Sequence, residues 1–248
     1  MSSPQVYALF FAACGVGTII YGLFVRRRLG AMRGTRTLNI ADLTAQPPGG
    51  GVTCEIKGKA EPGPAGQLQG PYSGKPCVWF ATKVEERWIE HRSHNGRPRR
   101  RRRSRTVEEK SSAPYFQVRD ATGAAVLDLR GTKIDAPVQT HRRVVPVGQG
   151  GFKEFAIEFL RNKHDQELVY SEVIVPPGQP VYALGKGGPH PQTGAPMLTE
   201  PDSGPFIVST RSEEQLTQRT SARMIASYVV GGLLFAGGGI TAGVLALV

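Results

Sequence analysis

Two long stretches without a charged side chain lie at the ends of this 248-residue chain, and they restrict its fold more than any other feature. Residues 6–25 are followed at once by three arginines, and residues 224–248 end the sequence. About 20 helical residues at roughly 1.5 Å each cover the ~30 Å hydrocarbon core of a bilayer. A soluble helix of this length would carry a polar face, which both stretches lack. The sequence therefore predicts transmembrane helices over residues 6–25 and 224–248.

The first stretch admits three other interpretations. A cleaved signal peptide begins with a basic segment, but residues 1–5 contain no basic side chain. The motif Phe11-Ala-Ala-Cys14 has the outline of a lipoprotein cleavage site, yet the apolar run continues beyond the cysteine. A buried helix of a soluble protein is disfavoured by the second apolar stretch. A membrane span remains the preferred prediction.

Basic residues flank both stretches on the side of the central region. They are Arg26, Arg27, Arg28, Arg33 and Arg36 after the first stretch, and Arg211, Arg219 and Arg223 before the second. Basic residues near span ends tend to stay in the cytoplasm. We therefore expect a two-span protein of the plasma membrane, with a cytoplasmic central domain and both termini pointing outward.

Small residues recur four apart in both stretches, a spacing that lets helices approach closely. The pairs are Ala13 with Gly17, Thr18 with Gly22, and Gly239 with Gly243. Either the two spans pack together or dimerise, or the pairs reflect only how common small residues are in membrane helices. The sequence leaves both interpretations open.

The central region, residues 38–210, is predicted to be a β-rich α+β domain. Short runs of β-branched and aromatic residues alternate with Gly/Pro turns, which is typical of a small barrel or sandwich. A short helix is expected over residues 38–44. Strands are expected over residues 52–60, 77–89, 115–120, 124–129, 168–175, 181–184 and 206–210.

Three further segments complete the prediction. Residues 151–161 carry apolar side chains at helical spacing, so an amphipathic helix is expected to lie on the sheet or on the membrane surface. A juxtamembrane helix over residues 212–223 should run into the second span. Residues 184–196 are expected to form a flexible loop.

An arginine run is the most unusual polar feature and contributes to the net charge of +11. We predict a mobile basic loop over residues 97–105 at the tip of a hairpin, because like charges repel. Anionic lipid headgroups are one expected partner, and a solvated loop without a partner is the alternative. Nucleic acid is disfavoured, since the run lacks interleaved aromatic side chains. The candidate binding residues are Arg97, Arg99, Arg100, Arg101, Arg102, Arg103 and Arg105.

Several motifs follow one another along the chain: Gly58-Lys59-Ala60, the segment from Gly70 to Phe80 (GPYSGKPCVWF), Asp120-Ala-Thr-Gly123, Tyr170-Ser-Glu172 and Val181-Tyr-Ala-Leu-Gly185. In this order they resemble the GIDE ("beside a membrane") domain of membrane-anchored mitochondrial E3 ubiquitin ligases. The resemblance implies a β-rich recognition or self-association domain between two spans. The residues that match the family's motifs include Gly74, Pro76, Cys77, Asp120, Gly123, Glu172, Gly178 and Gly185.

The ligases of this family depend on a RING domain with eight Cys/His ligands for two zinc ions. No such domain is visible in this sequence, so ligase activity is not expected to carry over. The family includes bacterial members, and a bacterial plasma membrane is the preferred location. A eukaryotic source would instead imply the mitochondrial outer membrane.

No catalytic, metal or cofactor site is predicted. The five histidines are scattered, and no serine has a nucleophile context. Cys54 and Cys77 are either reduced and buried or joined in a disulfide. The leading hypothesis is a membrane-anchored interaction scaffold that binds another protein or a second copy of itself. One alternative is an E3 ligase-like component whose RING belongs to a partner, and another is an anionic-lipid sensor.

Overall fold

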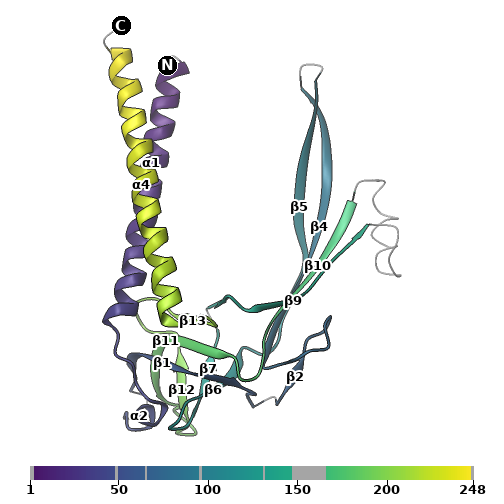
Figure 1. Ribbon diagram of the computed structural model, residues 1–248, viewed down its shortest axis with the longest axis vertical. Coiled ribbons are helices and arrows are strands. Elements are labelled where there is room, and N and C mark those ends of the chain that lie inside the picture. Colours follow the sequence, from purple (N-terminus) through teal and green to yellow (C-terminus); the bar gives the residue numbers. More distant parts are fainter. Residues whose placement is uncertain are drawn as a thin grey trace.

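The computed structural model describes residues 3–47, 50–64, 66–94, 97–130, 132–146 and 166–246. Two long helices rise from a β-barrel, and a second sheet leaves the barrel beside them (Figure 1). The helices are α1 (Ser3–Gly34) and α4 (Glu213–Ala246), which lie against each other along much of their length. Both chain ends therefore lie at the same far end of the molecule (Figure 1).

Five strands close the barrel. They are β1 (Val52–Glu61), β6 (Tyr115–Arg119), β7 (Ala124–Asp128), β11 (Pro180–Pro189) and β12 (Pro196–Thr199). β1 pairs with both β6 and β11, which closes the ring, and β7 pairs with β12 in parallel. Such a five-stranded Greek-key barrel is the architecture of OB-folds. The predicted small β-rich barrel is confirmed.

Alternating side chains fill the barrel. Cys54 and Ile56 of β1 point into the core, where they meet Phe116 and other fully buried residues. The short helix α2 (Ile40–Thr44) covers the barrel with two completely buried apolar side chains, from Ile40 and Leu43. The helix expected over residues 38–44 is thus confirmed, and it serves to seal the core.

A second sheet contains the strands β5-β4-β10-β9 in that order. Its members are β4 (Trp79–His94), β5 (Arg97–Ser111), β9 (Val138–Pro146) and β10 (Gln166–Val175). Within the described residues β4 pairs with β10 from Trp79 to Trp88 and with β5 from Ala81 to His94, so beyond Trp88 only β5 accompanies it. The outer part of β4 and β5, which we call the basic ribbon (residues 85–94 and 97–106), extends in the same direction as the two helices (Figure 1).

Four two- or three-residue strands complete the structure. They are β2 (Leu68–Gln69), β3 (Pro76–Cys77), β8 (Ile134–Asp135) and β13 (Ile207–Ser209). β13 adds to the free edge of β11, and β8 pairs with β13 in parallel.

The helices are fixed to the outside of the barrel by a small apolar cluster. Leu29 and Met32 of α1 and Leu216 of α4 pack on Tyr182 and neighbouring residues of the barrel wall. Beneath this cluster the Tyr182 hydroxyl donates to the buried carboxylate of Glu55 over 2.7 Å. Apolar contacts thus join the helical pair to the barrel, and the buried hydrogen bond joins β11 to β1 directly below them.

The helices approach each other at small residues. A Cβ added to Gly22 would lie 2.8 Å from Ser227 Oγ, and one added to Gly231 would lie 2.7 Å from Thr18 Oγ1. Of the two interpretations that the sequence left open, packing of the two segments against each other is seen at the Thr18/Gly22 pair. At Gly17 an added Cβ would meet nothing within 4 Å, so no close approach occurs there. Side-chain contacts of Gly239 and Gly243 lie outside the described residues.

One helical segment of the described chain is long and apolar enough to cross a membrane. It spans Phe10–Gly34 of α1. The second predicted span does not meet the same criterion within the described residues. α4 is continuous from Glu213, so the predicted juxtamembrane helix and the following apolar segment form one rod.

Two loop predictions are wrong. The expected hairpin is present as β4 and β5, but residues 97–105 are strand rather than loop, because they pair in register with β4 and because β4 places carboxylates beside the arginines. Arg105 reaches Glu86 at 3.0 Å and Arg103 reaches Glu90 at 3.1 Å, which offsets part of the charge repulsion. Residues 184–196 are mostly strand, since β11 continues to Pro189 and β12 begins at Pro196. The helix predicted over residues 151–161 lies outside the described residues.

Candidate protein-interaction groove

A buried glutamate holds the loop 70–75 against the second sheet. Glu172 on β10 has no exposed surface. Its carboxylate accepts hydrogen bonds from the Tyr72 backbone N–H at 2.7 Å and from the Ser73 and Thr140 hydroxyls at 2.5 Å each. The Ser73 backbone N–H also donates to it, at 3.4 Å. Tyr72 and Ser73 belong to the loop, and Thr140 belongs to the neighbouring strand β9. Glu172 therefore positions Tyr72 over the sheet.

The protonation state of Glu172 follows from two opposing effects. Burial raises the pKa of this carboxyl group, and the hydrogen bonds from Ser73, Thr140 and the loop backbone lower it. The effect of the hydrogen bonds is the larger one, so the pKa of Glu172 lies below its usual value. Glu172 is thus an ionised structural clamp near neutral pH and is not poised to transfer a proton.

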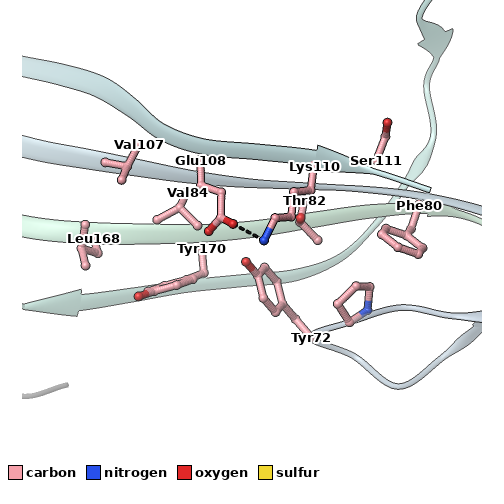
Figure 2. A pocket seen from close by; sticks show the side chains of 11 residues that line it. Tyr72, Phe80, Thr82, Val84, Val107, Glu108, Lys110, Ser111, Leu168 and Tyr170 are labelled. Carbon is pink, nitrogen blue, oxygen red and sulfur yellow. Dashed lines mark ion pairs between the residues drawn. The ribbon is translucent and has the colours of Figure 1, made fainter. Parts of the chain in front are cut away.

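The loop and the sheet enclose a groove of about 630 Å³ (Figure 2). Its floor is formed by Val84 of β4 and Leu168 and Tyr170 of β10, and Phe80 lies toward one end. The Tyr72 ring stands at the mouth, perpendicular to the Tyr170 ring with 5.9 Å between the ring centroids. An apolar floor beneath two tyrosines is suited to binding apolar or aromatic side chains.

The rim of the groove carries charge. Glu108 and Lys110 of β5 form an ion pair over it (Figure 2). Val107 lies beside them with 43% of its surface exposed, which is high for a β-branched side chain. The tyrosine at the mouth, Tyr72, is also 36% exposed, and burial of the rest raises its pKa. The lining offers apolar contacts and a few hydrogen-bonding groups.

The predicted anionic-partner residues continue outward from this groove on β5. Arg100, Arg101, Arg102, Arg103 and Arg105 are all exposed. The strand register places Arg105 and Arg103 on the same sheet face as Val84 and Tyr170, opposite Glu86 and Trp88 of β4. The backbones of Arg97 and Arg99 also belong to β5, while their side chains lie outside the described residues. The structure thus joins an apolar groove and a basic ladder on one surface.

The residues that match the family's motifs have structural roles. Asp120 closes the β6–β7 hairpin by accepting from Thr122 and Gly123 N–H, and it also accepts from Ile40 N–H at 2.9 Å, which fixes the start of α2. Hydrogen bonds from these groups outweigh burial and lower the pKa of Asp120. Gly185 lies where an added Cβ would be 2.6 Å from the Thr199 carbonyl oxygen.

The remaining motif residues serve turns or the core. Gly74 and Gly178 have φ values of 65° and 76°, in the left-handed region that favours glycine. Pro76 and Cys77 form β3, and Cys77 is buried beneath the loop. Of this set, Glu172 influences the groove without lining it, because it holds Tyr72 in place. Tyr170 was not predicted from the sequence as a lining residue. The available signal was the period-2 alternation of β10, which places Tyr170 on the same sheet face as Glu172.

The described residues show no reactive centre in this region. Cys54 and Cys77 are free and buried, so the disulfide alternative is wrong. Burial raises the pKa of the Cys54 thiol to about 11 and also raises that of Cys77, which disfavours the nucleophilic thiolate. Three or more His, Cys, Asp or Glu side chains do not gather into a metal-binding group anywhere in the described part of the chain.

Comparison with known proteins gives one match. The family model GIDE, described as an E3 ubiquitin ligase, matches residues 85–243, which include the basic ribbon, the groove-forming strand β10 and most of α4. Curated proteins and solved structures give no match.

Proposed function

This chain belongs to the GIDE family, and on that premise we propose that it is a membrane-anchored interaction module without catalysis of its own. The observation that carries the proposal is the groove between Tyr72 and the second sheet. Its floor is apolar and aromatic, its rim carries an ion pair, and the buried carboxylate of Glu172 behind the loop is fully engaged in holding Tyr72 in place. Such a surface is suited to binding a partner and not to catalysing a reaction.

The proposed occupant is an extended apolar segment of a partner protein. The groove follows the strand direction, because Phe80, Thr82 and Val84, which are alternate residues along β4, all line it. Side chains of an extended chain alternate at a spacing of about 7 Å, which allows every second side chain to enter such a groove. The Glu108–Lys110 pair at the rim would contact the alternate, polar side chains.

We further propose that α1 crosses the membrane and that the apolar part of α4, residues 224–246, accompanies it. The two helices contact each other at Gly22 and Gly231, as paired membrane helices do at small residues. The barrel would then lie on the cytoplasmic face of the plasma membrane, in keeping with the arginines that follow α1's apolar segment. An alternative, favoured by the family match, is an E3 ligase-like component that works with a RING-bearing partner.

A photo-crosslinking amino acid tests the groove in the full-length protein in its native membranes. Placed at Val107, the crosslinking residue lines the groove. Placed at Val144 of β9, which is 42% exposed and does not line the groove, it serves as the control. We expect one discrete adduct from position 107, removed by Tyr72→Ala, and no matching adduct from position 144. Adducts of equal yield and identity at both positions, or none at 107, would refute a dedicated groove.

A second measurement addresses catalysis. We expect the purified full chain in detergent to contain no stoichiometric zinc and to transfer no ubiquitin when supplied with activating and conjugating enzymes and ATP. Ubiquitin transfer by the purified chain would reject a purely non-catalytic module and support the ligase alternative.

A further inference from the structure

Positive charge is concentrated on one strand of this protein. β5 carries eight basic and two acidic side chains. Arg103 and Arg105 have carboxylate partners on β4. For Arg100, Arg101 and Arg102 no ion pair is found among the described residues, and all three are exposed. The guanidinium groups of these three arginines can therefore bind an external anion.

The basic ribbon and the membrane helix leave the barrel in the same direction (Figure 1). From Met32, which is packed on the barrel, to Val25 at the end of the apolar segment, α1 rises about 10 Å. From Val84 to His94, β4 covers about 33 Å. The ribbon is therefore long enough to reach the surface of a bilayer that α1 crosses.

Arginine side chains do not remain in the hydrocarbon core when they can reach the interface. An upright ribbon would carry its arginines past the headgroups, so it must stop at the surface and lie along it. A β-bulge between Val84 and Glu85 lies at the root of the ribbon. Bulges bend strands and increase their twist, which gives the ribbon a point at which to turn.

We propose that the basic ribbon lies on the cytoplasmic leaflet and binds the phosphate groups of anionic lipids through Arg100, Arg101 and Arg102. Each guanidinium offers several N–H donors in a fork that fits phosphate oxygens. A second copy of the chain is a poor partner for β5, because its own arginines would face arginines. The proposal depends on α1 being in the membrane and is independent of what fills the groove.

The native tryptophans supply a reporter. The chain has two, and Trp79→Phe leaves Trp88, which lies opposite Arg103 on the ribbon. The full-length protein is placed in nanodiscs of phosphatidylcholine, with or without phosphatidylglycerol, that contain a dansyl-headgroup lipid as energy acceptor. We expect energy transfer from Trp88 to rise when phosphatidylglycerol is present.

Arg100→Gln, Arg101→Gln and Arg102→Gln together should lower the ratio of docked to undocked ribbon by about 100-fold. The matched control changes Lys133, Arg142 and Arg143 to Gln, three exposed basic residues elsewhere, and should keep the wild-type transfer. Independently of any variant, raising salt to ~1 M shortens the Debye length to about 3 Å and should reduce the wild-type signal to that of neutral discs.

Equal transfer in neutral and anionic discs, or a signal that does not change with salt, would overturn the proposal. So would an equal loss in the control variant, because the effect would then be one of net charge. A single-stranded oligonucleotide that binds in neutral discs through the same three arginines, with lipid-dependent transfer absent, would identify nucleic acid as the partner and also reject the lipid proposal.

Discussion

Replacing Glu172 by Gln tests whether one buried charge holds the groove together. The substitution keeps the shape of the side chain and removes its negative charge. The new amide group would turn its own N–H donors toward at least one of the present donors, the Tyr72 N–H and the Ser73 and Thr140 hydroxyls. Hydrogen bonds to a charged group contribute about 1.5–3 kcal/mol each and are not additive.

We expect Glu172→Gln to lower the free energy of unfolding by about 3 kcal/mol. For a chain of this size, that corresponds to a fall in the thermal midpoint of roughly 6–12 °C. The loop should detach before the sheet unfolds, since Glu172 is its main polar attachment. Chymotrypsin should then cut after Tyr72, which is already 36% exposed, several times faster than in the wild type.

The effect should depend on pH in a defined direction. The folded-state pKa of Glu172 is lowered, so its contribution is fully present above the unfolded value of about 4.3. It is lost as the pH falls through the lower folded-state pKa. The stability difference between wild type and variant should therefore be constant from pH 7 to about pH 5 and should shrink below about pH 4.

The matched control is Glu167→Gln on the same strand, whose carboxylate makes no hydrogen bond recorded among the described residues. It should change stability by no more than about 0.5 kcal/mol. Equal thermal midpoints and equal cleavage after Tyr72 for Glu172→Gln and wild type would show that the proposed clamp is not what holds the loop.

Three further substitutions test other contacts. Gly22→Leu should separate α1 from α4 and lower the thermal midpoint in detergent by several degrees, while Gly17→Leu, which meets nothing within 4 Å, should not; equal midpoints would contradict the packing. Tyr182→Phe removes the donor to buried Glu55 and should cost about 1–3 kcal/mol in chemical unfolding, whereas no loss would mean that water replaces the hydroxyl. Gly185→Ala should destabilise the barrel by at least 1 kcal/mol in the same assay, because its Cβ would lie 2.6 Å from a carbonyl oxygen.

Elements with strong local signals were predicted well. The Asp120-to-Gly123 hairpin, the capping helix at Ile40–Thr44 and strand β1 follow from turn chemistry and alternation, which act over a few residues. Strand β9 was missed, because its exposed, basic sequence has little alternation and it forms only by pairing with β10. Tertiary pairing also overrode the expectation that an arginine run must be a loop.

The candidate groove was only partly visible in the sequence. The segment around Tyr72 stood out as a motif, but nothing in its composition indicated where its tyrosine would rest. Tyr72 and Tyr170 lie almost one hundred residues apart and meet because Glu172 joins the loop to β10. Contacts of this kind depend on strand order, which single-sequence patterns do not encode.

The sequence by itself determined the apolar α1, the short strands of the barrel and the excess of positive charge, because hydrophobicity, backbone preference and charge belong to individual residues and their near neighbours. Only the tertiary structure decided that the barrel closes through β1, that the two terminal helices lie together on it, and that the arginines form one edge of a sheet beside them. Those outcomes depend on which distant segments bury each other's apolar surface and hydrogen-bond each other's backbones, and burial is a property of the whole fold.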